Sequence, residues 1–312
     1  VKERFPSMYN FVSQCYNTKS YLCYGSDIIL SEEGVQQGDP LGPLLFCVVI
    51  QPIIESVQSK LNQWYLDDGS IGGNVDLLVE DLKRIISLSE DVGLKLNPTK
   101  CEVLRFKPLA ESEIQKLNEV IPGISIPSRE DFCLLGAPLL LGGIPPAIDK
   151  KVTKISLLIS RLNGLNSHQA LFLLKNCLSI PRIMHLLRSA PCGLFKEKLN
   201  IFDDMIKNSA EVLTNVSFDE KIWMQCSLPI RKGGLGLIST ADIASSAFIS
   251  SMNATADLRL QILPSNDELL DTAVEIWKLE SAAEVASDKP SIQKSWSITG
   301  KEIRRPTSFF WK

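Results

Sequence analysis

The sequence predicts an α+β protein, with β-hairpins concentrated in its first third and helices in the remainder. Before residue 110, short runs of β-branched and aromatic residues flank turn-forming residues, a pattern typical of antiparallel hairpins. After residue 145, apolar residues recur every three to four positions, which predicts amphipathic helices. Helices packed on an antiparallel sheet give an α+β layer. The 312 residues suffice for two or three compact units, since domains typically span ~100 to 150 residues.

The first thirty residues predict a short helix followed by a hairpin. Ser7 is positioned to cap a helix that extends through Asn17. Residues 21–30 carry aromatic and β-branched side chains on both sides of Gly25 and Ser26, which predicts a hairpin that turns at this pair. Because the chain opens on Val1 in what reads as the middle of an element, we expect the sequence to begin inside a larger protein.

Residues 36–43 predict a loop that enters a buried helix. Pro40 suits the first helical turn, and an apolar run begins at Leu44. We interpret Asp39 as the N-cap of this helix in preference to a catalytic acid. Gly38 would let another group approach the backbone closely.

Residues 61–73 predict two short strands joined by a tight turn that carries Asp67 and Asp68. The Asp68-Gly69 pair alone explains a turn, because both residue types tolerate positive φ. A second adjacent carboxylate adds repulsion that a divalent cation would relieve, and Mg²⁺ prefers one or two carboxylates together with substrate phosphates. The alternative that stays open is a solvated hairpin tip.

Downstream of this hairpin, the pattern predicts an amphipathic helix over Val75 to Asp91 that Gly93 ends. Two further strands are expected at residues 94–96 and 101–106, on either side of an Asn97-Pro98 turn. These elements would complete a layer of helices on a sheet.

From residue 146 the chain predicts helices that carry many cations. The first helix has an apolar face made of Ile148, Val152, Ile155, Ile159 and Leu162, while Lys150, Lys151, Lys154 and Arg161 lie on its other faces. Asn166 with Gln169 suggests a cap for a helix over residues 171–178, and Pro181 breaks the next stretch.

The charge distribution matters because the net charge of −3 and pI of 5.6 are not typical of a nucleic-acid binder. Residues 145–235 hold thirteen Lys and Arg against seven Asp and Glu, a balance of +6 that leaves −9 for the rest of the chain. Positive charge is therefore concentrated where a phosphate backbone could use it. Ordinary solvated helix faces remain the alternative.

The last third is less informative. The glycines of residues 228–237 predict a turn, residues 241–285 suggest helices, and the polar end over residues 287–312, which includes Phe309 to Trp311, is expected to be loosely ordered.

Composition argues against several other classes of protein. The eight cysteines are scattered without a Cys-x-x-Cys pair, and only His168 and His185 supply imidazoles, so neither zinc nor disulfides are predicted. No run of ~18 apolar residues and no signal peptide is visible, so we expect no membrane span and an intracellular, cytoplasmic or nuclear, location.

Four segments, in this order and spacing, resemble signature segments of reverse transcriptases, most closely those of the non-LTR retrotransposon type. Residues 65–68 (Tyr-Leu-Asp-Asp) resemble the Tyr-x-Asp-Asp box, and residues 37–43 (Gln-Gly-Asp-Pro-Leu-Gly-Pro) the segment that precedes it. Residues 93–102 resemble the segment that follows, with Lys100 as its lysine, and residues 134–138 the primer-grip region. The resemblance covers roughly residues 1 to 230.

The resemblance implies a division of the chain and a set of site residues. Residues 1–144 would form part of the fingers and palm, residues 145–217 a helical thumb, and residues 218–312 a helical extension. Catalysis would rest on Asp67 and Asp68 as ligands of Mg²⁺, or of Mn²⁺, with Lys100 as acid for the pyrophosphate unless it is only a surface lysine. The remaining implied contacts are the nucleotide and template at Gln37, Gly38 and Tyr65, and the nucleic-acid backbone at Lys150, Lys151, Lys154 and Arg161.

The implied substrates are an RNA template, a DNA primer and deoxynucleoside triphosphates, within a larger retroelement polyprotein and without a membrane. In the family a bridging aspartate comes from a strand upstream of the Gln-Gly-Asp-Pro segment, whose place would lie before Val1, and Asp27 is not a plausible substitute. We therefore expect a partial RNA-directed DNA polymerase that is inactive by itself. The alternative is a catalytically silent nucleic-acid-binding or interaction module derived from a retroelement.

Overall fold

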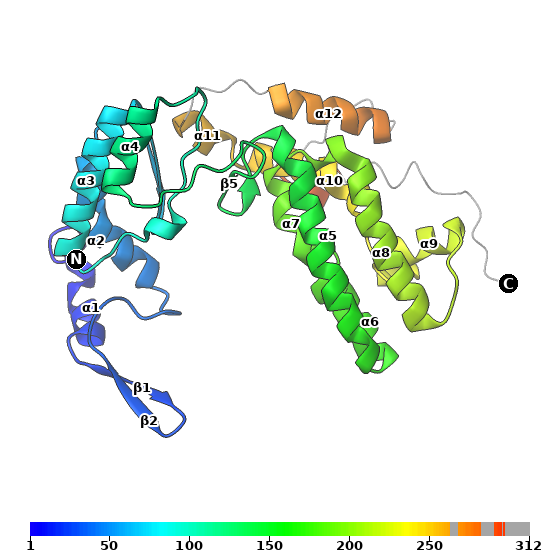
Figure 1. The fold of residues 1–312 in the computed structure, drawn as a ribbon. Helices are drawn as coiled ribbons and strands as arrows, with labels where there is room; N and C mark the ends of the chain where they lie inside the picture. Colours follow the sequence, from blue (N-terminus) through cyan, green and yellow to red (C-terminus); the bar gives the residue numbers. More distant parts are fainter. Residues whose placement is uncertain (263–267, 282–289, 295, 297–312) are drawn as a thin grey trace. The chain divides into compact units, whose positions relative to one another are not determined.

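The computed structural model describes residues 1–262, 268–281, 290–294 and 296. The chain divides into two compact units, Val1–Ile126 and Pro127–Lys312, which are described separately (Figure 1). The predicted boundary at residues 144 and 145 coincides with the start of a helix inside the second unit. The division into fingers and palm, thumb and extension stays a prediction.

The first unit begins with a 3-10 turn, Pro6–Met8, and helix α1 (Tyr9–Tyr16). Met8 precedes α1 and no side chain caps it, so the predicted cap by Ser7 is wrong. Strands β1 (Ser20–Tyr24) and β2 (Asp27–Ser31) pair with Tyr24 opposite Asp27, which confirms the hairpin that turns at Gly25 and Ser26.

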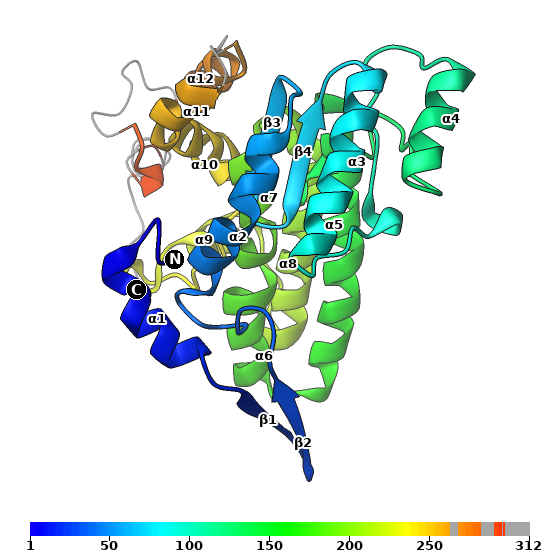
Figure 2. The same cartoon turned by 90° about the vertical axis from the view of Figure 1, so that its left-hand side faces the viewer.

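The centre of the first unit is a hairpin covered on one face by two helices (Figure 2). Helix α2 (Gly42–Ser56) leads into strands β3 (Leu61–Tyr65) and β4 (Asp68–Gly72), and helix α3 (Val75–Asp91) follows. Their shared core consists of Ile53 from α2 and Val57 directly after it, Trp64 and Ile71 from the strands, and Ile85 and Leu88 from α3. The hairpin and the bounds of α3 are as predicted.

Both ends of α3 have local causes. The Asn74 side chain accepts a hydrogen bond from the Leu77 N–H at 2.9 Å and caps the helix. At the other end Gly93 adopts a φ of +76°, and the N–H groups of Gly93 and Leu94 bond back to the last turn, so the predicted stop is confirmed.

A buried carboxylate fixes the connection between α2 and β3. Asp81 on α3 is fully buried and accepts hydrogen bonds from the N–H of Gln58 at 3.0 Å and of Ser59 at 2.9 Å. It also accepts from the Ser59 hydroxyl at 2.6 Å and from Arg84 at 2.9 Å, while Arg84 donates to the Ser56 carbonyl. This network positions the start of β3, which leads to the Asp67 turn.

The prediction of two strands after α3 is wrong. Residues 94–96 form no strand, residues 98–100 form a 3-10 turn, and residues 101–106 make only one parallel bridge, between Glu102 and Ser125. Helix α4 (Glu111–Val120) packs on α3. Among the described residues, the protein has three separate two-stranded sheets in place of one palm sheet, so the α+β class holds only in its coarse form.

The second unit starts with a small hairpin and continues as a helical bundle. Strands β5 (Cys133–Leu134) and β6 (Ala137–Pro138) enclose a turn in which Leu135 and Gly136 both have positive φ. The remaining elements are α5 (Ile144–Ser160), α6 (Ser167–Leu173), a π-helical turn (Leu174–Leu178), α7 (Ile180–Ser189), α8 (Lys196–Thr214), α9 (Glu220–Ser227), α10 (Thr240–Ala254), α11 (Ala256–Ile262) and α12 (Glu268–Ser281).

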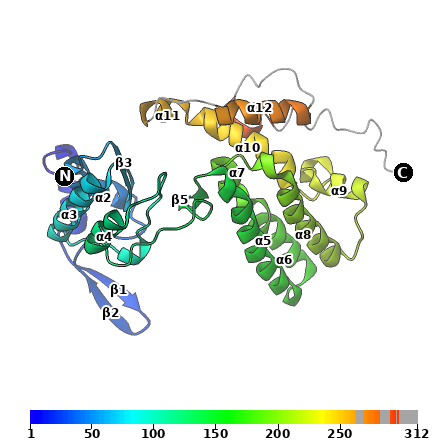
Figure 3. The same cartoon turned by 45° about the horizontal axis from the view of Figure 1, so that its top comes forward.

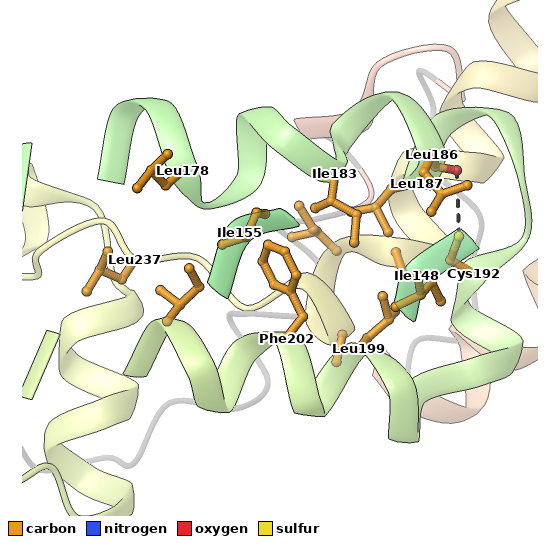
Figure 4. Packing of buried hydrophobic residues seen from close by; sticks show 14 of the residues in the cluster. Ile148, Ile155, Leu178, Ile183, Leu186, Leu187, Cys192, Leu199, Phe202 and Leu237 are labelled. Atoms are coloured by element: carbon orange, nitrogen blue, oxygen red, sulfur yellow. Dashed lines mark hydrogen bonds between the residues drawn. The ribbon is translucent and has the colours of Figure 1, made fainter. Parts of the chain in front are cut away.

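The bundle core lies between α5, α7 and α8 (Figure 4). Ile148 and Ile155 on α5 face Ile183 on α7 and Phe202 on α8, and all four side chains are fully buried. Leu162 is buried as well, and Val152 and Ile159 pack against the same core. The predicted apolar face of α5 is confirmed.

The helix boundaries around α6 were predicted in part. Asn166 accepts a hydrogen bond from the Gln169 N–H at 3.0 Å, as expected, but the helix starts at Ser167 and not at residue 171. Pro181 lies in the first turn of α7, so the chain does break before it.

The combined helical run Ser167–Ser189 is long and apolar enough, by length and composition, to cross a membrane. The sequence analysis missed this run. Its Leu174, Ile183 and Leu187 side chains are buried in the bundle core, and the core helix of a bundle satisfies the same criteria.

Helix α10 packs against α7, α8 and α12 (Figure 3). A second small core lies beside it, where Trp277 on α12 meets Trp296 edge to face with ring centroids 4.7 Å apart. The helices expected over residues 241–285 are confirmed over residues 241–262 and 268–281, and the rest of that range lies outside the described residues. The buried Trp296 shows that part of the segment expected to be loosely ordered is packed, while residues 287–289, 295 and 297–312 lie outside the described residues.

Candidate active site

The candidate site is built around the two-residue turn of the β3–β4 hairpin. Tyr65 lies opposite Asp68, so Leu66 and Asp67 form the turn. Leu66 has a φ of +54°, an uncommon conformation for a residue with a branched side chain. The sequence predicted the turn at Asp68-Gly69, but both of these residues belong to β4. The turn lies two residues earlier, at Leu66 and Asp67.

A cavity of about 630 Å³ within the first unit brings two of the predicted segments together. Asp67 and Leu66 contribute from the hairpin turn, and Gln37 and Gly38 from the loop before α2. The volume lies in the range of ligand pockets, ~300 to 1,000 Å³. Apolar side chains form most of the remaining wall: Phe46, Ile50, Ile53, Trp64, Ile85, Leu94 and Leu96.

The loop beside this cavity is held by Asp39. Its Oδ1 accepts a hydrogen bond from the Leu41 N–H at 2.9 Å, and its Oδ2 accepts one from the Tyr16 hydroxyl. The hydrogen bond from Tyr16, followed by that from Leu41, holds the pKa of Asp39 below its usual value. Asp39 therefore ties the loop to α1, but it is not the N-cap of α2 that the sequence predicted.

The details of the helix entry differ from the prediction. Leu41 is the capping residue of α2 and Pro43 lies in its first turn, so Asp39 and Pro40 both stand before the helix. One side of α2 is exposed at Leu44 and Val49, so this helix is only half buried. Gly38 has a φ of +95°, a conformation that favours glycine, and no protein atom lies within 4 Å of a would-be Cβ. The predicted approach of another group to this backbone stays a prediction.

The two aspartates of the hairpin do not share a position. Asp67 lines the cavity, whereas Asp68 pairs with Tyr65 on the strand face opposite Trp64 and the helices. Tyr65 is 64% exposed and lies outside the cavity wall. Both carboxylates are exposed, and neither accepts a hydrogen bond within the described part of the chain, so both are free to bind a cation.

Two lysines follow α3, and the structure distinguishes them. Lys100 is exposed in the 3-10 turn after Asn97 and does not line the cavity. Lys95 does line it, on the same wall segment as Leu94 and Leu96. Sequence reasoning missed Lys95, although its position between two apolar residues was a signal that it borders an apolar wall.

The four predicted backbone-binding cations all lie in the second unit. Lys150, Lys151 and Lys154 are on α5, and Arg161 begins the 3-10 turn that follows. Lys150 forms an ion pair with Asp131 at 3.4 Å, while the half-buried Lys151 and the exposed Lys154 and Arg161 have no ion pair within the described residues. Three of the four therefore remain available to a phosphate.

Comparison with known proteins supports the same family as the signature segments. The sequence profile described as "Reverse transcriptase (RNA-dependent DNA polymerase)" matches residues 2–139. This match spans a little under half of the chain and supports a reverse transcriptase. The matched segment contains the Gln37-Gly38 loop and the Asp67-Asp68 hairpin, which are the two parts that meet at the cavity.

A similar relative points to the same type of reverse transcriptase as the signature segments. The "Retrovirus-related Pol polyprotein from type-2 retrotransposable element R2DM" of Drosophila melanogaster is 24% identical over 317 aligned positions. The match covers 90% of this chain but only 29% of the relative. It supports a non-LTR retrotransposon reverse transcriptase, and no solved structure matches the chain.

Proposed function

We propose that this reverse transcriptase domain takes part in RNA-directed DNA synthesis, in which deoxynucleotides are added to a DNA primer on an RNA template. The supporting observation is the cavity in which the exposed Asp67 carboxylate meets the Gln37-Gly38 loop. The volume fits a ligand of nucleotide size. Nothing in the described residues favours the alternative of a silent binding module.

In this proposal Asp67 and Asp68 hold Mg²⁺, with Mn²⁺ as a possible substitute. Their fit rests on chemistry, because exposed carboxylates with no competing hydrogen bonds are the ligands that these hard cations prefer. The ions would supply charge stabilisation to the transferring phosphoryl group. The chain itself would orient the nucleotide through the Gln37-Gly38 loop and place the Lys95 or Lys100 ammonium near its phosphates.

We further propose that Asp67 and Asp68 do not complete the site alone. Two-metal catalysis holds its ions ~3.5 to 4 Å apart between converging carboxylates, and of this pair only Asp67 lines the cavity. The cavity wall also contains Asp39, whose two oxygens already accept hydrogen bonds from Tyr16 and Leu41. A further carboxylate from an additional strand would therefore be needed. We expect residues 1–312 alone to extend a primer no better than their Asp67→Asn variant, and clear extension above that variant would contradict this second proposal.

The test of the function itself is primer extension on an RNA template by a longer protein that contains this domain. Asp67→Asn should reduce extension at least ~100-fold, because a lost metal-bound charge removes several kcal/mol of transition-state stabilisation. Asp91→Asn, at the exposed end of α3, makes the same chemical change outside the cavity and should leave extension intact. Near-normal extension by Asp67→Asn, with both variants melting as the wild type, would contradict the metal role.

A further inference from the structure

Lys175 is an unusual lysine in the second unit. It lies on the π-helical turn between α6 and α7, is half buried, and has no ion pair within the described residues. A Cβ built at Gly236 would lie 2.9 Å from its Cε and 3.0 Å from its Nζ, so the ammonium rests against the backbone of Gly236. Single π-helical turns inside helices are frequent at functional sites.

The loop formed by residues 228–237, which Lys175 contacts at Gly236, is tightly folded and carries exposed cations. The N–H groups of Gly233, Gly234 and Gly236 already donate to carbonyls of the same loop. The loop therefore has no free N–H groups at its glycines to offer an anion. Its exposed charged residues are Arg231 and Lys232, which have no ion pair within the described residues.

The surrounding sequence lacks acidic residues. Residues 150–196 contain eight Lys and Arg and neither Asp nor Glu, and residues 221–241 contain three cations and no acid. Lys150 and Lys198, at the edges of this region, pair with Asp131 and Asp149. Lys175 therefore lies where its own segment provides no counter-ion, which is the condition for attracting an external anion.

An exposed aromatic side chain lies one helical turn before Lys175. Phe172 is 63% exposed and lines a shallow hollow of about 410 Å³ with His168, Gln169, Leu165 and Leu173 of the same segment. Aromatic side chains beside cations are the means by which proteins hold a nucleic-acid strand, because bases stack on the ring while phosphates meet the charges.

We infer that Lys175, Arg231 and Lys232 bind backbone phosphates of a nucleic-acid strand, with a base of that strand against Phe172. The inference rests on the proposed function, since it concerns how this reverse transcriptase holds its template or primer. It adds a site distinct from the cations of α5 and gives the Leu228–Leu237 loop a role: Gly236 leaves the space that the Lys175 side chain occupies.

The test uses residues 1–312 and measures binding of a labelled RNA strand, alone and paired with DNA, across salt concentrations. Lys175→Gln should weaken binding about three- to tenfold at low salt and lower the slope of log K against log salt by about 0.7 to 0.9, the value of one phosphate contact. Lys175→Arg should retain both. Phe172→Ala should weaken binding of the single strand about tenfold.

The matched control is Lys278→Gln, which removes one exposed lysine from α12. If wild-type protein shows no salt-dependent binding to either nucleic acid, the inference is overturned. If wild-type binds but Lys175→Gln equals Lys278→Gln, the inference alone is overturned. The proposed function is tested by the primer-extension assay with Asp67→Asn, and this site is tested by the binding assay with Lys175→Gln. Failure of one can therefore be distinguished from failure of the other.

Discussion

Trp64 lies directly opposite Gly69 in the β3–β4 hairpin, and a Cβ at Gly69 would come within 2.7 Å of the indole ring. The ring thus occupies the space above the glycine, and its Nε1 donates to Asn62 Oδ1 at 2.7 Å. Glycine at this position is a packing requirement of the hairpin whose turn carries Asp67.

Gly69→Ala should therefore destabilise the hairpin by about 1 to 3 kcal/mol, because the added methyl forces the indole out of its position. The measurement is amide hydrogen exchange of β3 and β4 in residues 1–312, which reports local opening. Gly73→Ala is the control, since its Cβ would lie 3.6 Å from Ser59 Oγ, an ordinary contact. Equal exchange in the two variants would refute the packing argument.

The Gly69 position also shows what the sequence could and could not predict. Alternating residues and an Asp-Gly pair were enough to predict the hairpin, and Val75 to Asp91 was found because its 3.6-residue period and Gly93 are local signals. The turn was placed one pair too late because the space over Gly69 is filled by Trp64, a cross-strand contact invisible to local turn rules.

The prediction of strands at residues 94–96 and 101–106 failed for a related reason, because it also depended on contacts between distant parts of the chain. A strand needs a partner, and Leu94 and Leu96 line the cavity wall while Glu102 meets only Ser125, beyond α4. The sequence also did not predict which acidic side chains are buried. Asp81 and Asp203 look like surface carboxylates in sequence, and only tertiary contacts show that they hold neighbouring chain segments.

Removal of the Asp81 carboxylate should destabilise the first unit. Asp81→Ala leaves the buried N–H and hydroxyl of Ser59 without an acceptor, as well as the N–H of the more exposed Gln58, and a stranded buried group costs about 1 to 3 kcal/mol. Urea unfolding of residues 1–312 is the measurement. Asp76→Ala, which removes an exposed carboxylate from the same helix, is the control and should cost at most a surface ion pair of about 1 kcal/mol.

The Asp81 network also predicts a pH dependence. Burial would raise the pKa of Asp81, but hydrogen bonds from Ser59 and Gln58 and the charge of Arg84 outweigh it, so the pKa lies below its usual value. A lowered folded-state pKa stabilises the protein above the unfolded value of about 3.9, and this contribution is lost as pH falls through the folded pKa. The stability difference between wild type and Asp81→Asn should shrink on acidification from pH 6 to pH 3. A difference that stays constant would contradict this assignment.

Asp203 should be the corresponding anchor of the second unit. On α8 it accepts hydrogen bonds from the Thr240 N–H at 2.8 Å, the Ser239 hydroxyl at 2.7 Å and the Ala241 N–H at 3.2 Å, which holds the start of α10. Asp203→Asn replaces one acceptor oxygen by a donor that faces these groups, and should cost about 1 to 3 kcal/mol. Asp204→Asn, exposed and adjacent, should be nearly neutral. Thermal melts compare the pair, and equal melting temperatures would contradict the anchoring role.

Tyr16→Phe should loosen the loop that borders the cavity. The Tyr16 hydroxyl donates to Asp39 and is the largest cause of the lowered Asp39 pKa, so its loss should return that pKa toward about 3.9, as NMR titration of the carboxyl carbon would show. The remaining bond from Leu41 keeps only part of the shift. Exchange of the Asp39 amide, which donates to the Gln36 carbonyl at 3.2 Å, should rise because the loop loses its tie to α1. Tyr24→Phe removes a hydroxyl from the exposed β1–β2 hairpin and should change neither readout. An Asp39 pKa unchanged in Tyr16→Phe would mean that Leu41 alone sets the charge of this loop, and the proposed link between α1 and the Gln37-Gly38 loop would be wrong.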